Sequence, residues 1–253
     1  MPRSSTRSPA PLVPVAFDSR RRERPDPADL DLADGTVTRV AQQKKDPDRA
    51  SVFIDDAFAF GLDVELVVKG GVRKGVRLTA EQQRALLVQQ ETYAAKASAL
   101  ASLSHRARTA QEVRQSLGRK GFADDVVEDT VALLERLDMI DDAAYARAFV
   151  KSRFDARGYG PARLRQDLMR KGVARRTIDL ALEELTEDED LGAEARRLAE
   201  KKWRSLASED DPRKRKKKAM DYLVRRGYGF DRARAAVEAV AAADESFEDE
   251  GWM

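Results

Sequence analysis

The chain has 253 residues, of which 36% are charged and only 6% are aromatic, so the composition suits small helical units rather than one thick core. The formal net charge is a modest +2, and the lack of cysteine together with a lone histidine, His105, excludes disulfides and thiolate or histidine zinc sites. The N-terminal apolar stretch is short and is interrupted by Pro14, and no run approaches 18 apolar residues, so neither a secretory signal nor a membrane span is predicted and we expect a cytoplasmic protein.

Residues 1–33 are rich in Pro, Arg and Asp and show no hydrophobic periodicity, which predicts a disordered leader. Within residues 1–24, six arginines against Asp18 and Glu23 give a net charge of +4. One interpretation is a solvated leader, and the other is an arm that touches nucleic acid.

Residues 34–77 are predicted to form a small β-rich module. Apolar and polar residues alternate over 36–41, turn formers follow at 46–48, and a second apolar run occupies 51–54, which together predict a β-hairpin. A further apolar run at 58–60 predicts a third short strand in the same sheet.

A short helix is predicted to close this module. Asp63 is expected to cap a helix that carries Val64, Val67 and Val68 on one face, and the glycines that open the stretch 70–75 are expected to stop it. This stretch lacks the Lys-Ser/Thr ending of a phosphate-binding loop, so a turn is favoured over a nucleotide site.

The rest of the chain has the pattern of helices. Thr79 and Gln82 form a capping box that begins a proline-free helix running to Leu103. Beyond this helix, apolar residues recur at helical spacing up to the acidic C-terminal residues.

One helical segment occurs three times, at 113–121, 164–172 and 219–227. Each copy reads apolar residue, three spacers, Leu, one spacer, two cations, Gly. The two apolar residues are expected to face a core, the cations to lie in the last turn where the helix dipole favours them, and the glycine to supply the left-handed residue after the helix. Each copy therefore predicts the end of a helix.

A second helix is predicted after each of these glycines. Its apolar positions match from copy to copy, with Val127, Val131 and Leu134 in the first, Ile178, Leu182 and Leu185 in the second, and Ala233, Val237 and Val240 in the third. The helix starts agree as well, with Thr109 and Glu112 as a capping box, Gly160-Pro161, and Asp211-Pro212.

The spacing of the copies predicts the domain organisation. Gly121, Gly172 and Gly227 are 51 and 55 residues apart, which leaves room for three helices per copy. The predicted fold class is mainly α, a tandem array of three three-helix modules that follows the β-hairpin module. We place the modules at residues 78–140, 141–190 and 191–243, and an acidic tail at 244–253.

The sequence resembles the bacterial RecX family. The resemblance rests on DDAAYARAFVKSR at 141–153, RGYGP at 157–161, LRQDL at 164–168 and, upstream, FIDDAFAFGL at 53–62, and it covers roughly residues 36–243. The Arg/Pro leader, the acidic tail and a polybasic run in the third module depart from the family pattern.

This resemblance implies a function that sequence physics alone does not name. It implies an elongated, curved array of modules that lies in the groove of the RecA filament on DNA and inhibits its ATP hydrolysis and strand exchange. The implied partners are RecA and single- and double-stranded DNA, in recombination, DNA repair and the SOS response. We expect a monomer without a cofactor, a metal or a membrane partner.

Basic residues concentrate in the second and third modules. Residues 156–176 carry seven cations and one carboxylate, and residues 201–218 carry nine cations and three carboxylates, so each segment has a net charge of +6. Arg163, Arg170 and Lys171 are expected to share a solvent face. The run at 213–218 is expected to contact nucleic acid or filament rather than to serve folding, because like charges at i and i+4 destabilise a helix.

The candidate binding residues for a partner or nucleic acid are all basic and come from the three repeat copies. They are Arg114, Arg119, Lys120, Arg157, Arg163, Arg165, Arg170, Lys171, Arg175, Arg176, Arg213, Lys214, Arg215, Lys216, Lys217, Lys218, Arg225 and Arg226. Two acidic segments oppose them, at 183–190 with a charge of −6 and at 244–253 with −5. We expect the second of these to compete for the basic helices.

Aromatic residues near the basic segments allow two interpretations. Tyr159, Tyr222 and Tyr228 either stack on bases or pack in the core, and packing is favoured. A further set falls on apolar stripes and is predicted to be core: Tyr145, Phe149, Phe154 and Trp203.

No catalytic constellation is found in the sequence, so we do not expect an enzyme. Asp138, Asp141 and Asp142 could hold a metal, but a helix-capping role is favoured because they lie between two predicted helices. Two functions remain: a negative regulator of the RecA filament, or a DNA-binding protein that acts by competing for DNA through its basic helices.

Overall fold

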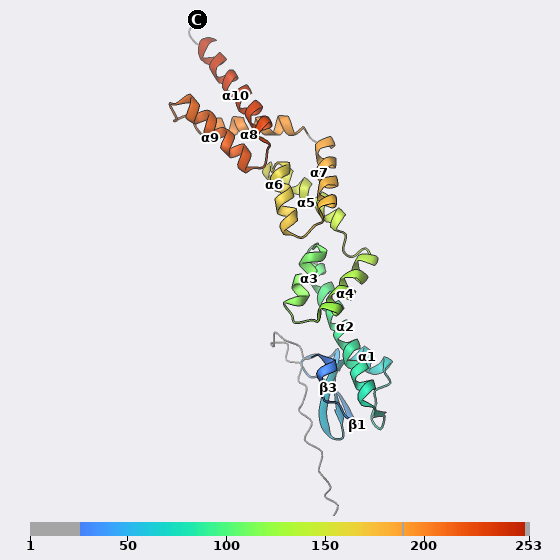
Figure 1. The fold of residues 1–253 in the computed structure, drawn as a ribbon. Coiled ribbons are helices and arrows are strands. Elements are labelled where there is room, and N and C mark those ends of the chain that lie inside the picture. The colour runs from blue at the N-terminus through green and yellow to red at the C-terminus, as the bar shows by residue number, and fades with distance from the viewer. Residues whose placement is uncertain (1–25, 189, 251–253) are drawn as a thin grey trace, which may run out of the picture. The chain divides into compact units, whose positions relative to one another are not determined.

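The computed structural model describes residues 26–188 and 190–250, apart from the side chains of residues 188 and 245–250 (Figure 1). These residues form two units. One consists of the residues up to His105 with Arg114–Leu133, and the other of Arg106–Val113 with the residues from Leu134 onward. Most of the predicted leader and the last residues of the predicted tail lie outside the described residues.

The first unit begins with a four-stranded antiparallel sheet in the order β3-β2-β1-β4. The strands are β1 (Gly35–Gln42), β2 (Arg49–Ile54), β3 (Ala57–Asp63) and β4 (Arg77–Leu78). Asp55 and Asp56 turn between β2 and β3 with positive φ, as a tight hairpin requires. The predicted hairpin and third strand are confirmed, whereas the two-residue strand β4 was too short to be predicted.

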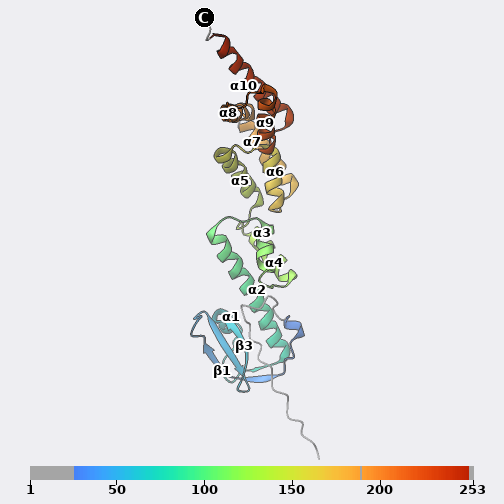
Figure 2. The ribbon, with the colours of Figure 1, turned by 90° about the vertical axis from the view of Figure 1, so that its left-hand side faces the viewer.

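Helix α2 (Ala80–His105) lies against this sheet (Figure 2). Its fully buried Leu87 packs with Val37, Val52 and Phe60 of the strands. The predicted capping box is confirmed, because Thr79 N donates to Gln82 Oε1 at 2.9 Å and Gln82 N donates to Thr79 Oγ1 at 3.2 Å.

Helix α1 (Val64–Lys69) is capped by Asp63 as predicted, but its buried face is different. Leu66 is buried and Val67 packs against the core, whereas Val68 is 73% exposed and Val64 is also exposed. The prediction failed because six residues make too few turns for a spacing of apolar residues to define one face.

Residues 26–33 belong to the first unit and not to a disordered leader. Asp26 caps the short 3₁₀ helix Pro27–Asp29, in which Pro27 is buried, and Leu30 packs against the core of the sheet. Arg84 of α2 donates to the carbonyls of Pro27 and Leu30 at 3.2 and 3.4 Å. Contacts with a helix more than 50 residues away order this segment, and such contacts leave no local pattern in the sequence.

Eight further helices follow and carry the three repeat copies. They are α3 (Ala110–Gly118), α4 (Asp124–Arg136), α5 (Asp142–Arg157), α6 (Pro161–Arg170), α7 (Arg175–Asp188), α8 (Leu191–Arg204), α9 (Pro212–Arg225) and α10 (Phe230–Glu250). The repeated glycines Gly121, Gly172 and Gly227 follow α3, α6 and α9 with φ of 77°, 77° and 94°. The mainly α fold, with three helical domains after a small strand module, is confirmed.

The second unit contains two separate hydrophobic cores. Helices α5, α6 and α7 bury Leu164, Leu168 and Ile178 in one, and α8, α9 and α10 bury Leu223 and Val237 in the other. These positions are the repeated apolar residues, so the second and third copies of the repeat each fold around a core of their own.

Residues 244–250 continue helix α10 and do not form a separate tail. Asp244 Oδ2 accepts hydrogen bonds from Trp203 Nε1 and from Arg215, both at 2.8 Å. These bonds tie α10 at Asp244 to α8 and α9. Within the described residues, none of the helices is both long and apolar enough to cross a membrane.

Candidate partner-binding surface

Helices α3, α6 and α9 carry the repeated segment and are the middle helices of the three copies. In the second unit, the ends of these helices meet from one copy to the next. Thr109 Oγ1, before α3, donates to the carbonyl of Lys171, after α6, at 2.7 Å. Gly160 N, before α6, donates to the carbonyl of Arg226, after α9, at 2.8 Å. The N-terminus of one middle helix thus meets the C-terminus of the next, at equivalent positions of the repeat.

The repeated glycine allows this close approach. A Cβ atom on Gly227 would lie 2.4 Å from Arg163 N, and one on Gly172 would lie 2.3 Å from Gln111 Cβ. Both glycines also have positive φ. The sequence predicted only the helix-ending role, so the contact between modules is an additional constraint on the same residue.

In the second and third copies, the second cation of the pair lies in such a junction. Lys171 Nζ pairs with Glu112 Oε1 at 2.8 Å, and Arg106 pairs with Glu112 Oε2 at 2.9 Å. Burial of the Glu112 carboxyl opposes its ionisation, but the hydrogen bonds from Lys171 and Arg106 outweigh this effect and hold the pKa of Glu112 below its usual value. At the equivalent position, Arg226 donates to the Arg157 carbonyl.

A strongly basic groove lies beside α5, α6 and α9. It consists of two hollows of about 180 and 350 Å³ that share Arg163, Asp167 and Arg170. We call it the cationic groove, and its six cations are Arg153, Arg157, Arg163, Arg170, Lys171 and Arg225. Among the residues that line the groove, Asp167 carries the sole carboxylate, and it is paired with Arg170.

Tyr159 marks the most crowded part of the groove. The guanidinium carbons of Arg163, Arg157 and Arg226 lie 3.9, 5.9 and 6.0 Å from its ring centroid. A hydrogen bond from Arg157 to the phenol oxygen, with the charges of Arg163 and Arg226, lowers the pKa of Tyr159 although burial opposes the shift. Three guanidinium groups around one half-buried ring create a strong local preference for an anion.

This arrangement can bind anionic groups. Guanidinium groups bind phosphate or carboxylate oxygens in a bidentate manner, and several of them add up along a groove. In the part of the chain that the structure describes, no three metal-ligating side chains come together. Asp141 accepts from Ala143 N and Ala144 N at 2.8 Å, which confirms its capping role at α5.

Comparison with known proteins places these features in one family. A family model for the regulatory protein RecX N-terminal domain matches residues 35–79, and models for the first, second and third RecX three-helix domains match residues 95–134, 141–182 and 188–237. A curated regulatory protein RecX from Clostridium perfringens is 32% identical over 200 residues, which are 78% of this chain and 92% of that protein. The chain belongs to the RecX family.

Solved RecX structures share this fold. A crystal structure of regulatory protein RecX superposes with a TM-score of 0.64 at 24% identity, covering 81% of this chain and 98% of that one. The crystal structure of RecX from Lactobacillus salivarius gives a TM-score of 0.55 at 25% identity, covering 59% of this chain and 96% of that one. The sequence resemblance to the RecX family is therefore confirmed.

The second RecX three-helix domain places its candidate residues on two surfaces. Arg157, Arg163, Arg170 and Lys171 line the cationic groove. Arg165 and Arg175 pair instead with Asp179, at 2.7 and 3.9 Å, beside a separate hollow between α6 and α7, and Arg176 is exposed on α7. Basic density along the sequence therefore overstates how many charges act together.

The candidates of the first RecX three-helix domain lie in the first unit. Arg114 pairs with Glu128 at 2.9 Å, and Lys120 binds the Ser98 hydroxyl. Arg119 is exposed.

The polybasic run of the third RecX three-helix domain serves folding in part. Arg215 lies over the Trp203 ring at 4.2 Å and donates to Asp244 at 2.8 Å, and its side chain is only 18% exposed. Lys214 pairs with Asp211, and Lys218 with Glu209. Arg213 and Lys217 are exposed, Lys216 is half-buried, and Arg225, after the run, lines the cationic groove.

The sequence missed two features of the groove. Phe149, Arg153 and Arg157 are spaced four residues apart, so they share one face of α5, and that spacing could have pointed to Arg153. Phe149 and Tyr145 were predicted to be core, and both pack against the core but are only half-buried, whereas Phe154 and Trp203 are buried as predicted. Of the three tyrosines assigned to packing, Tyr228 is buried, and burial raises its pKa, while Tyr159 and Tyr222 are half-buried and pack against the two cores.

Proposed function

We propose that this RecX family member binds a RecA-type recombinase filament on DNA and lowers its ATP hydrolysis and strand exchange. The cationic groove supports this proposal, because it gathers six cations and one paired carboxylate on a surface that spans two repeat copies. A filament on DNA presents both phosphates and acidic protein surfaces, and a groove with an excess of cations fits either.

The first experiment measures ATP turnover. The chain is added in substoichiometric amounts to RecA, single-stranded DNA and ATP, and turnover is expected to fall. The test variant is Arg170→Glu with Arg225→Glu, because both side chains are exposed and line the groove. It is expected to inhibit at least tenfold less potently.

The control variant carries the same charge change elsewhere. Lys44 and Lys45 are exposed near the end of β1, in the first unit, so Lys44→Glu with Lys45→Glu is expected to inhibit as the unmodified chain does. If the unmodified chain leaves turnover unchanged at saturating concentration, the proposal is wrong.

The second candidate function is a DNA-binding protein that acts by competing for DNA. The six cations of the cationic groove favour it, because a row of cations neutralises the phosphates of a DNA backbone. Salt separates the two functions, since binding through six or more phosphates loses on the order of 10³-fold in affinity between 50 and 200 mM salt. If the chain binds RecA in the absence of DNA, the result supports the first candidate, the regulator of the RecA filament.

A further inference from the structure

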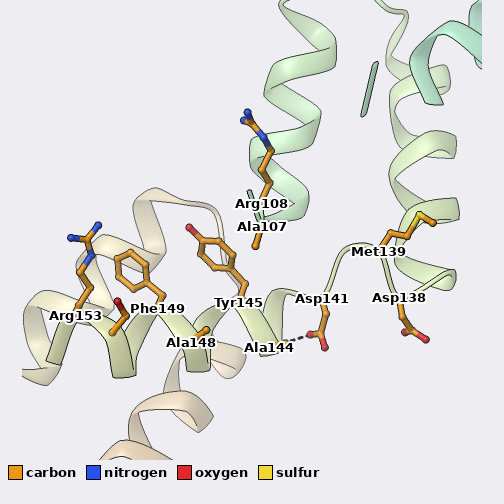
Figure 3. A pocket seen from close by; sticks show the side chains of 11 residues that line it. Ala107, Arg108, Asp138, Met139, Asp141, Ala144, Tyr145, Ala148, Phe149 and Arg153 are labelled. Carbon is orange, nitrogen blue, oxygen red and sulfur yellow. Dashed lines mark hydrogen bonds between the residues drawn. The ribbon is translucent and has the colours of Figure 1, made fainter. Parts of the chain in front are cut away.

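A larger hollow, of about 700 Å³, lies beside the N-terminal half of α5 in the second unit. Figure 3 shows Tyr145, Ala148 and Phe149 along one side of it, with Met139 at one end. We call it the apolar pocket. Rings and methyl groups make up most of its lining, in contrast to the neighbouring cationic groove, and Arg108, Arg153, Asp138 and Asp141 also line it.

The apolar pocket exposes side chains that are costly to leave in water. Met139 is 51% exposed. The Tyr145 and Phe149 rings are half-buried and stack with their centroids 6.2 Å apart and their planes at 16°. An exposed methionine beside aromatic rings is typical of surfaces that bind apolar side chains of different shapes.

The apolar pocket and the cationic groove join through two residues. Phe149 and Arg153 line both hollows. A ligand that occupies both therefore carries an apolar group with anionic groups next to it, because the groove beyond Arg153 is basic.

The two ends of the apolar pocket differ in charge. Along α5, Arg153 lies at the end that leads to the groove, and Asp138 and Asp141 lie at the opposite end (Figure 3). Carboxylates at that end repel a phosphate chain that runs through the whole pocket. The anionic groups of the ligand must therefore lie on one side of its apolar group.

The rings favour a protein side chain over a nucleobase. Lys171 Nζ lies over the rings of Tyr145 and Phe149, at 5.5 and 5.7 Å, and Arg153 lies over Phe149 at 5.3 Å. Cations therefore cover a ring face that a stacked base needs. The Met139 thioether and the alanine methyl groups remain available to contact an apolar side chain.

We propose that the apolar pocket receives one large apolar side chain of the recombinase, with the acidic residues that flank this side chain lying in the adjoining cationic groove. The inference rests on the proposed function, and it adds the chemistry of the partner's contact segment. Contact with protein through the pocket then accompanies contact with anions through the groove.

The test blocks the pocket without disturbing the core. Ala148 is exposed on α5 and lines the pocket, so Ala148→Glu fills it and adds a repelling charge, while Met139→Ser removes an exposed apolar group from the loop before α5. Each variant is expected to bind the RecA filament on single-stranded DNA about tenfold more weakly. Affinity for DNA without RecA is expected to stay unchanged.

Two controls make the result specific. Ala132 of α4 is exposed and lines neither hollow, so Ala132→Glu is expected to bind as the unmodified chain does. Arg153→Gln is expected to weaken filament binding several-fold, whereas Arg136→Gln, at the exposed end of α4 and outside both hollows, is expected not to. Circular dichroism verifies that each variant is folded.

The outcomes distinguish a failure of the proposed function from a failure of the inference about the apolar pocket. If the unmodified chain does not bind the filament, the proposed function and this inference both fail. If the chain binds and both pocket variants bind equally well, only the inference is overturned. If the pocket variants lose affinity for DNA in the absence of RecA, the pocket takes a base and the inference is overturned as well.

Discussion

Helices α6 and α9 are equivalent in the repeat, yet they use their cations differently. Helix α9 carries the denser run, but Arg215 is held against Trp203 and Asp244, and Lys214 and Lys218 pair with nearby carboxylates. Helix α6 has fewer cations, and Arg163 and Arg170 both line the cationic groove. The comparison shows that the fold around a helix, and not its charge density, decides which cations can meet a partner.

The largest effect is expected where the two helices meet. Gly227→Ala introduces a Cβ 2.4 Å from Arg163 N at a residue with φ of 94°, so it should lower the free energy of unfolding by about 3 kcal/mol. Gly118→Ala is the matched control, because a Cβ on Gly118, at the end of α3, meets nothing within 4 Å. It should leave stability unchanged or raise it by up to about 1 kcal/mol in urea unfolding.

The second-largest effect is expected in the affinity for the RecA filament. Arg170→Glu with Arg225→Glu should lower affinity for the RecA filament about 30-fold, or about 2 kcal/mol, because both charges line the groove. Arg213→Glu with Lys217→Glu, in the denser run, should lower it less than about threefold. Fluorescence anisotropy at two salt concentrations measures both, and the reverse order would contradict the comparison.

A smaller effect is expected in the stability of the third module. Arg215→Ala removes the hydrogen bonds to Asp244 and to the Trp203 carbonyl, and it should destabilise the fold by about 1.5 kcal/mol. Arg213→Ala, two residues earlier and exposed, should change stability by no more than about 0.5 kcal/mol. Equal losses in thermal unfolding would mean that Arg215 has no structural role.

The smallest effect concerns the junction between the C-terminal end of α6 and the N-terminal end of α3. Because the folded protein holds the pKa of Glu112 below its usual 4.5, the stability from its ionised form is present above that pH and is lost as pH falls through the folded-state value. Glu112→Gln should therefore cost about 1 kcal/mol at pH 7 and progressively less below pH 4.5. A difference that persists at pH 3 would show that Glu112 acts through packing.

The sequence predicted the features that depend on neighbours along the chain. The helix-ending glycines, the cap by Asp141 and the hairpin all follow from residues within a few positions of one another. The partner of Lys171 could not be predicted, because Glu112 lies 59 residues away. The same holds for the Trp203 contact of Arg215, which turns a charge expected at the surface into part of a core.

Helix α5 shows why the apolar pocket was mistaken for core. Ala146, Val150 and Phe154 form the buried stripe, and Tyr145 and Phe149 lie directly beside it. In sequence the two stripes form one broad apolar face, so periodicity alone cannot say where the core ends. Only the packing of the second unit separates the residues that are covered from those that remain available.

The end-to-end contact between successive middle helices has a direction. Each contact joins the N-terminal end of one middle helix to the C-terminal end of the next. It therefore has the polarity of head-to-tail subunit assembly, but within one chain. Because the two surfaces differ, a further module could be added without any new kind of interface. Conversely, a chain cut after α7 would leave Gly160 N and Ala162 N without the carbonyls of Arg226 and Gly227, so the last module acts as a terminator for the one before it.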